Sequence, residues 1–332
     1  MATAQEPPDV TWPDGLVDVV SAHLSCEVAT IARDGTPIAW PMVPLYLPER
    51  DEFLLTTSIG FPAKIAHLER DARVSLLFSD PTGSGSGAPP VVLVQGSATV
   101  EPEVQTATGD LLAHWARVHA VQPMSRLFSS TPPTRWFMDF YYMRRLIRVR
   151  PETVTWWPDR DTAHAPRRRQ LAPVAPAAAP VPAPTHATVG DAEWTDLVRN
   201  LARFPDAVLN AYDDDGRPVG LRASPRVDHA ARVLHWPGPA GVDVAAGPAS
   251  VLWHSHDETM WSLRSFAARG AIAPGDDGLV FTPGGVLPGL GLSGPLGDGK
   301  VFLDARRRAG RYLSRRGLPR PRIPWDRLRV PT

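Results

Sequence analysis

Hydrophobic residues in the first half of the chain occur in short runs that are separated by turn residues. The runs at 26–33, 37–46, 53–57, 73–78, 91–100 and 145–157 predict β-strands. Apolar residues at helical spacing predict helices at 16–24, 61–70 and 103–119. Asp34 and Gly35 separate the first two runs, as in a β-hairpin. This pattern predicts a mainly β fold, a small β-barrel with peripheral helices.

The second half repeats this order. A helix is predicted at 194–204, and strands are predicted at 207–212, 218–223, 232–236, 249–254 and 265–272. Asp215 and Gly216 stand where Asp34 and Gly35 stand in the first half. A repeat of this length indicates a domain duplication. We therefore predict one barrel domain at 10–157, a second and degenerate one at 188–332, and between them a Pro- and Ala-rich linker at 158–187 in extended polyproline II conformation.

Composition narrows the functional classes. The 332 residues include 35 Lys plus Arg and 35 Asp plus Glu, so the formal net charge is zero and nothing draws the whole chain to nucleic acid or membrane. Cys26 is the only cysteine, which excludes an intrachain disulfide and favours a buried structural thiol. The segment 1–9 has no basic flank and no apolar core, so we expect no secretory signal, and no apolar run is long enough to span a bilayer. We expect a cytoplasmic protein.

The most informative segment follows the third predicted strand. Thr56, Thr57 and Ser58 end that strand, and Pro62 and Lys64 follow at the start of a predicted helix. Hydroxyls, unpaired backbone N–H groups and an ammonium at a helix N-terminus can together hold a phosphate. A capped helix start with a surface lysine is the other interpretation. The second half has no lysine and no Ser/Thr cluster after Trp236, so it lacks this candidate phosphate site.

These segments resemble a known family. The stretches at 29–37, 53–57, 64–76 and 94–98 are similar to the pyridoxamine-phosphate-oxidase-like split barrels, the flavin and deazaflavin oxidoreductase group. The resemblance extends over about 16–157 and more faintly over 194–330. It implies two tandem split β-barrels, with flavin mononucleotide (FMN) or a deazaflavin bound at a barrel–barrel interface.

The resemblance also implies roles for individual residues. Lys64 would bind the cofactor phosphate, together with the hydroxyl and backbone groups of Thr56, Thr57 and Ser58. The isoalloxazine face would be lined by Trp40, Pro41, Met42 and Val43.

Two residues outside these motifs are further candidates. Arg135 could reach an anionic substrate or cofactor tail, or could form a surface ion pair. Trp136 could stack on the ligand or belong to the core. No acid–base dyad is evident, so no catalytic residue is assigned.

The chain also departs from the family pattern. Pyridoxamine phosphate oxidases end in an Arg-Leu-His motif, whereas Asp326-Arg327-Leu328-Arg329 stands here, so synthesis of pyridoxal phosphate is not expected. We predict an FMN-dependent oxidoreductase that acts on a small molecule. The alternatives are a deazaflavin-dependent reductase, a non-catalytic ligand-binding or regulatory split barrel, and haem binding. The second barrel could replace the homodimer partner, or first barrels could pair between two chains.

Four other signals are weaker. The segment Gly294–Lys300 resembles a nucleotide-binding loop but continues with Val301, so we expect a flexible loop before a helix from Lys300 to Arg316. We expect His254 and His256 at a polar strand end rather than on a metal, and His114 and His119 on a solvated helix face. The basic run from Arg306 to Arg316 is a pattern that can contact nucleic acid, but because the whole chain is neutral we expect a solvated helix face or a contact with an anionic cofactor tail instead.

Overall fold

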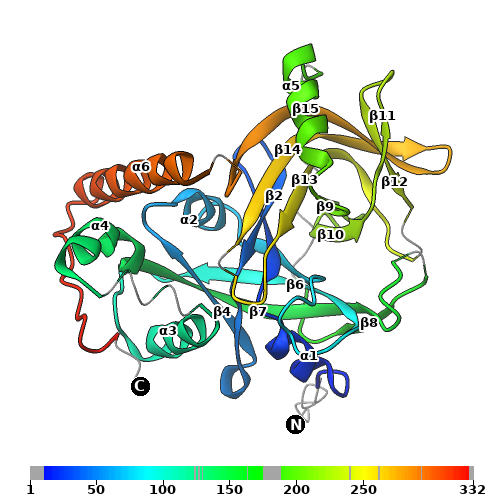
Figure 1. Cartoon of the computed structure of the whole chain (residues 1–332). Coiled ribbons are helices and arrows are strands. Elements are labelled where there is room, and N and C mark those ends of the chain that lie inside the picture. The colour runs from blue at the N-terminus through cyan, green and yellow to red at the C-terminus, as the bar shows by residue number, and fades with distance from the viewer. Residues whose placement is uncertain are drawn as a thin grey trace, which may run out of the picture.

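The computed structural model describes residues 11–122, 125, 128, 130–162, 164–174, 188–238, 241–260, 262–292 and 294–328. It consists of two antiparallel sheets with helices around them (Figure 1). The first sheet contains β1 (Cys26–Ile31), β2 (Pro37–Met42), β3 (Leu45–Leu47), β4 (Glu52–Ser58), β5 (Arg73–Phe78), β6 (Val91–Val100), β7 (Arg144–Trp157) and β8 (Arg167–Gln170). Its half of the chain also contains α1 (Leu16–Ala22), α2 (Ala63–Leu68), α3 (Gly109–Val121), α4 (Pro132–Tyr142) and a 3₁₀ turn (Pro48–Arg50).

The second sheet has the topology of the first. It contains β9 (Ala207–Tyr212), β10 (Pro218–Ala223), β11 (Arg226–Asp228), β12 (Val233–Pro237), β13 (Ala245–Ser255), β14 (Arg264–Gly275) and β15 (Gly278–Leu290), with α5 (Asp191–Leu201) before it and α6 (Gly294–Arg315) after it. The strand orders are β2-β1-β5-β6-β7-β4-β3 and β10-β9-β13-β14-β15-β12-β11, which match strand for strand. The predicted mainly β architecture of two tandem, curled half-barrels is therefore confirmed.

The hairpin turns show why the repeat was readable from the sequence. Gly35 and Gly216 occupy the β1–β2 and β9–β10 turns with φ of 81° and 69°. A positive φ costs glycine little but strains other residues, so the Asp-Gly pairs locate both turns in the sequence.

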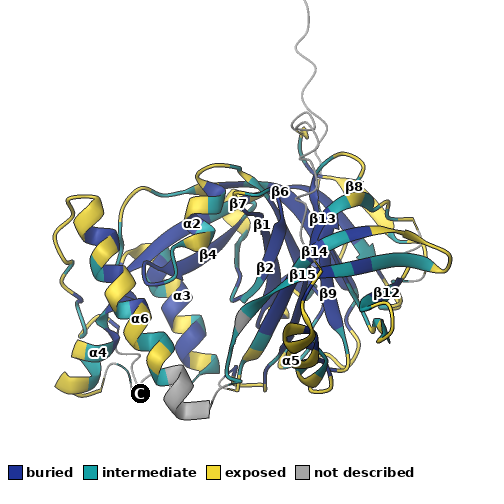
Figure 2. Ribbon diagram, turned by 90° about the horizontal axis from the view of Figure 1, so that it is seen from above, coloured by how far each residue is buried: buried dark blue, intermediate teal, exposed yellow. Residues whose placement is uncertain are grey.

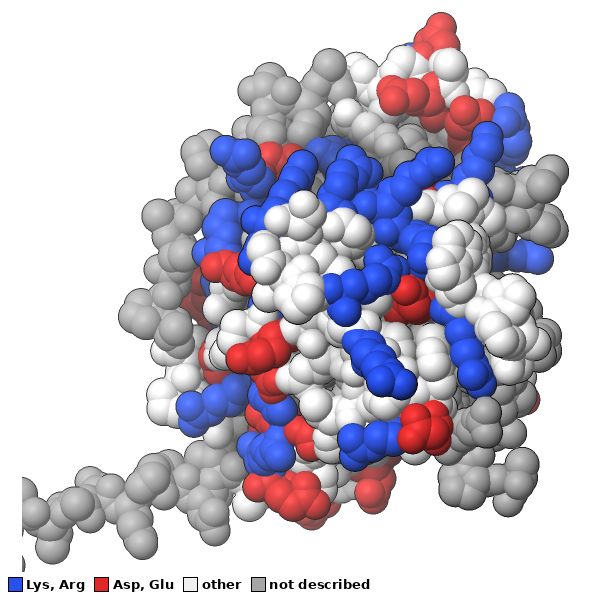
Figure 3. Space-filling view, turned by 90° about the vertical axis from the view of Figure 1, so that its left-hand side faces the viewer, with Lys and Arg blue, Asp and Glu red and all other residues white. Residues whose placement is uncertain are grey.

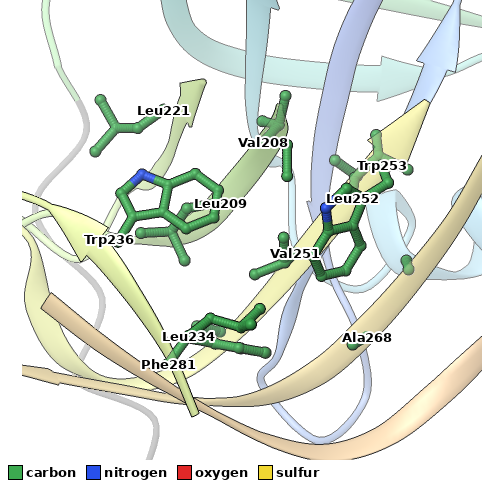
Figure 4. Close-up of a cluster of buried hydrophobic side chains, with 14 of the residues drawn as sticks. Val208, Leu209, Leu221, Leu234, Trp236, Val251, Leu252, Trp253, Ala268 and Phe281 are labelled. Carbon is green, nitrogen blue, oxygen red and sulfur yellow. The ribbon is translucent and has the colours of Figure 1, made fainter. Parts of the chain in front are cut away.

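The two half-barrels pack against each other within the chain. Strand β1 is buried along its whole length, because one of its faces covers the first core and the other faces the second sheet. Ala29, Ala39 and Leu77 belong to the same buried cluster as the interior of the second barrel. Figure 4 shows part of that interior, where Trp236, Val251 and Phe281 point toward one another from different strands. Figure 2 shows that burial is greatest where the sheets meet.

A buried carboxylate also joins the two halves. Glu27 on β1 is 1% exposed, and it accepts hydrogen bonds from Arg222 of β10 at 2.7 Å and from Ser79 at 2.9 Å. Nε2 of His254 on β13 lies 2.7 Å from the same carboxylate. Burial alone would raise the pKa of Glu27, but Arg222 and His254 outweigh it and lower the pKa from 4.5 to about 2. The buried negative charge of Glu27 therefore has its partners Arg222 and His254 on the second half, and these contacts join the two half-barrels.

The last part of the chain packs on the first barrel rather than on the second. Ala305, Ala309 and Tyr312 of α6 lie in a buried cluster with Ile59 and Phe140, and Figure 1 shows α6 above α4. The expected loop at 294–300 is wrong, because these residues form the first turns of α6. No helix was predicted at 132–142, where α4 lies.

The linker region contains an unexpected strand. Strand β8 pairs with β7 inside the segment that was predicted to be a spacer. The centre of that spacer, 175–187, lies outside the described residues. The domain boundaries at 157 and 188 therefore stay a prediction. In the part of the chain that the structure describes, no helix is both long and apolar enough to cross a membrane.

We expect Glu27→Gln to lower the free energy of unfolding by roughly 3 kcal/mol, because Arg222 then loses the fully buried carboxylate in the interface and keeps only its ion pair with Asp206. Denaturant titration would measure the change. As a control, Asp196→Asn removes the exposed ion pair to Arg199 and should cost less than about 0.5 kcal/mol. Equal losses in the two variants would contradict the role of Glu27 in the interface.

The same carboxylate should make the protein sensitive to acid. The pKa of Glu27 is lower in the folded state than the ordinary value of 4.5, so its stabilising contribution is complete above pH 4.5 and is lost as the pH falls toward about 2. Over this range the wild type should lose more stability than Glu27→Gln, which has no carboxyl to protonate. Parallel pH dependences for the two proteins would refute this assignment.

Candidate functional site

The turn between β4 and α2 is compressed between two helices. The Ser58 hydroxyl donates to the carbonyl oxygen of Phe140 at 2.6 Å and accepts the Gly60 N–H at 3.1 Å. A Cβ at Gly60 would come within 2.8 Å of both the Ala305 carbonyl oxygen and the Phe140 ring. Helix α2 begins after Pro62 without a side-chain cap, so Ser58 positions the turn and does not cap the helix. The hydroxyl of Thr57 makes only a long contact, 3.4 Å, with the Phe61 carbonyl oxygen.

Lys64 is half-buried and does not extend into bulk solvent. Its ammonium lies 4.8 Å from the centre of the Trp40 ring, in a cation–π contact. Among the described residues, none forms a hydrogen bond or an ion pair with it. Burial, reinforced by the charge of Arg144, lowers the pKa of Lys64 to about 8. The ammonium therefore has free hydrogen-bond donors and no counter-ion within the described chain.

Arg144 is a second cation without a carboxylate partner among the described residues. It is 7% exposed and lies at the start of β7, where its guanidinium donates to the Thr56 hydroxyl at 2.6 and 3.0 Å and to the Thr56 carbonyl oxygen at 3.0 Å. The rings of Trp115 and Tyr141 lie 5.2 and 5.1 Å from the guanidinium carbon. Burial lowers the pKa of Arg144. The sequence analysis missed this residue, although an Arg-Arg pair at the start of an apolar strand is a signal that could have identified it.

Two histidines next to these cations are neutral at pH 7. His114 lies 3.1 Å from the Thr56 hydroxyl, and burial together with Arg144 holds its pKa well below the usual range. His67 lies 3.0 Å from the Thr30 hydroxyl, and burial together with Arg70 and Lys64 lowers its pKa to about 4. The positive charge at this corner therefore comes from the lysine and the arginine.

The expected solvated face for His114 and His119 is wrong. They are 2% and 1% exposed, because this face of α3 packs on β4 and α4 through Trp115. Cys26, in contrast, is fully buried, as predicted.

Three of the predicted isoalloxazine-facing residues, Trp40, Pro41 and Met42, lie on the two faces of β2, and Val43 follows the end of that strand. Trp40 and Met42 pack with the core of the first barrel. Pro41 points to the other face because successive residues in a strand alternate. Pro41 and Val43 are half-buried. The rings of Trp40 and His67 are 5.5 Å apart, so Trp40 contacts α2 at both Lys64 and His67.

Arg135 and Trp136 lie in a different place. Both line a cleft of about 680 Å³ between α4 and the segment 321–326. Neither Lys64 nor any of the residues 56–58 lines this cleft. Trp136 is 67% exposed, so it is not a core residue. The structure thus separates these two candidates from the group on β2, β4 and α2.

We call Lys64 and Arg144, with the turn at 56–58, the cationic corner, and the described residues of the second half contain no counterpart of it. After β12 the chain continues to β13 without a helix in its described residues and without a lysine. His254 and His256 face the first barrel, where His254 contacts Glu27 and His256 lies 2.8 Å from the Ser25 hydroxyl. Both belong to the interface between the half-barrels.

No protein-family model matches the sequence, and a comparison with curated proteins finds no match. Several solved structures are similar to part of the chain. A pyridoxamine 5′-phosphate oxidase-related, FMN-binding protein from Nostoc punctiforme is 13% identical, covering 67% of this chain and 100% of its own, with a TM-score of 0.32. A protein of the pyridoxinephosphate oxidase family from Clostridium acetobutylicum is 11% identical over 47% and 92% of the two chains, with a TM-score of 0.31. An F420 reductase is 17% identical over 43% and 98%, with a TM-score of 0.27.

We expect Lys64→Met to stabilise the ligand-free protein by about 1 kcal/mol. Methionine keeps the apolar part of the side chain and removes a half-buried charge that has no counter-ion. Thermal unfolding would show the gain as a rise in Tm of a few degrees. A matched Lys300→Met variant changes an exposed lysine and should leave Tm unchanged. A lower Tm for Lys64→Met would show that the ammonium is stabilised by the fold.

Proposed function

We propose that the first half-barrel binds an FMN-type cofactor through Lys64, and that the protein is an oxidoreductase acting on a small molecule. The observation that carries this proposal is the half-buried Lys64 ammonium, which has no anionic partner among the described residues and lies against Trp40. A buried cation without a counter-ion costs stability, and such costs are typical of ligand sites.

The residues at this corner suit a phosphate. The Lys64 ammonium can donate up to three hydrogen bonds, and the Thr57 hydroxyl has only a weak contact that a stronger acceptor can replace. Arg144 adds positive charge while it fixes the position of Thr56. In the described residues no carboxylate pairs with either cation, so none neutralises the corner.

The remaining candidates suit the planar part of such a cofactor. Trp40 presents a half-buried aromatic ring beside Lys64. Pro41 lies on the face of β2 opposite to Trp40 and Met42, toward the second half-barrel, which we propose to act as the built-in partner of the first. When bound, the flavin supplies the redox chemistry, while the protein holds it, orients it and excludes water. A deazaflavin would make the same demands on these residues, and we propose it as the alternative cofactor.

The most direct test is to identify what the purified protein carries. We expect a visible absorbance band and release of a flavin or deazaflavin on denaturation, identified by mass. Protein that is colourless, and that stays colourless and unshifted in Tm after incubation with FMN and with F420, would support a non-catalytic split barrel instead. A Soret band would indicate haem.

Lys64→Ala should weaken FMN binding by about 1–3 kcal/mol, which is about 5- to 150-fold in Kd, because it removes a charge-assisted hydrogen bond to the phosphate. Titration followed by flavin fluorescence would measure this change. Lys300 is the only other lysine in the chain, so Lys300→Ala is a matched control with no expected effect. Unchanged affinity in Lys64→Ala would exclude this lysine from the site, whatever cofactor the protein holds.

A further inference from the structure

Helix α6 presents a basic face to solvent. One side of the helix is buried against the first half-barrel through Ala305, Ala309, Tyr312 and Leu313. The opposite side carries exposed cations at Lys300, Arg307, Arg308, Arg311 and Arg315. Figure 3 views the molecule from the side of α4 and α6, and it shows Lys and Arg side chains gathered there with few acidic side chains among them. The formal net charge of the chain is zero, but its charged side chains are unevenly distributed over the surface.

Several of these cations have no partner. Arg306 and Arg320 pair with Asp139, and Arg316 pairs with Glu69. In contrast, Arg308, Arg311, Arg315 and Arg322 form no hydrogen bond or ion pair with any described residue; we call these four the α6 basic surface. Arg308, Arg311 and Arg315 follow one another at three- and four-residue spacing, so they lie along one side of the helix.

An aromatic cleft lies at the end of this surface that Arg322 forms, beyond α6. Arg322 belongs to both, because it lines the cleft between α4 and the segment 321–326. Trp136 and Trp325 line the same cleft. The Arg306 guanidinium lies 4.3 Å from the centre of the Trp136 ring, yet this indole is 67% exposed. The fold leaves a large aromatic surface in water. Asp139, which pairs with Arg306, and Asp326 also line the cleft, so the unpaired positive charge lies mainly outside it.

We propose that the α6 basic surface and this cleft bind single-stranded nucleic acid. Its phosphates would bind the arginines, and an unpaired base would stack on the exposed part of Trp136. Proteins that bind single strands combine these two elements, a basic track and aromatic rings that accept any base. The cleft volume, about 680 Å³, is large enough for a nucleotide.

Other anionic partners fit less well. An anionic membrane would require apolar side chains that insert into lipid, but the apolar side of α6 is buried inside the protein. A duplex keeps its bases stacked, so they cannot reach the rings of a cleft. An acidic peptide would satisfy the arginines but has no planar bases for Trp136.

The test is binding of a fluorescently labelled oligothymidylate of about 20 nucleotides, followed by anisotropy at several salt concentrations. We expect binding at about 50 mM salt that weakens steeply as salt is added. The triple variant Arg308→Ala/Arg311→Ala/Arg315→Ala should reduce the affinity at least 10-fold. It should also reduce the slope of log K against log salt by about 2, since each phosphate contact on a single strand contributes about 0.7. Trp136→Ala should weaken binding about 5- to 100-fold and leave the slope unchanged.

The matched control is Arg199→Ala/Arg203→Ala/Arg226→Ala, which removes three exposed arginines from the second half of the chain and should have no effect. All the substituted residues are exposed, and thermal unfolding would verify that each variant folds.

The proposal is overturned if the wild type does not bind at 50 mM salt, or if the two triple variants bind equally well. It is also overturned if a duplex, phosphatidylserine vesicles or polyglutamate bind as tightly as the single strand. Competition by excess FMN, or loss of oligonucleotide binding in Lys64→Ala, would move the interaction to the Lys64 corner and would likewise overturn it.

Discussion

The pairing of the two half-barrels rests on buried ion pairs between them, Glu152 with Arg217 and, at the centre of a larger cluster, Glu27. This residue lies on the strand that both halves share as a wall, and Arg222 and His254 of the second half compensate its charge. Apolar packing around Ala29, Ala39 and Leu77 drives the association, but it does not specify one register. A buried, directional charge cluster does, because any shift would leave an unpaired charge inside the protein. The second half-barrel, although it lacks the cationic corner, thus has a structural role.

The cationic corner follows the opposite rule. At the interface each buried charge has a partner, whereas Lys64 and Arg144 have no carboxylate partner among the described residues. The rings of Trp40, Trp115 and Tyr141 reduce the free-energy cost of these unpaired charges, because their faces contact the cations without neutralising them. An anionic ligand would remove the imbalance. Arg308, Arg311 and Arg315 on α6 also have no partner among the described residues, but they are exposed and cost the folded state little.

Errors of the sequence analysis share one physical cause. Helix α4 and strand β8 were not predicted, because their patterns are weak and tertiary contacts stabilise them: α4 packs against α6, and β8 adds to the edge of β7. His114 was placed in solvent because the residues that surround it in the core, Thr56 and Arg144, come from strands that are distant in sequence. Net charge contains no information about where charges gather, so the expectation against nucleic acid stays an untested prediction.

The sequence by itself determined the two repeated strand orders, the Asp-Gly hairpins, the buried Cys26 and the absence of a second cationic corner, since periodicity and turn chemistry are local properties. It also pointed to Lys64, because the residues that surround it are adjacent in the chain. Only the tertiary structure decided that Arg144 and His114 join Thr56, that Glu27 lies between the half-barrels, and that α6 leaves the second half to cover the first. Each of these contacts joins residues that are far apart in sequence, and the free energy that selects them comes from burial and charge compensation in the assembled fold.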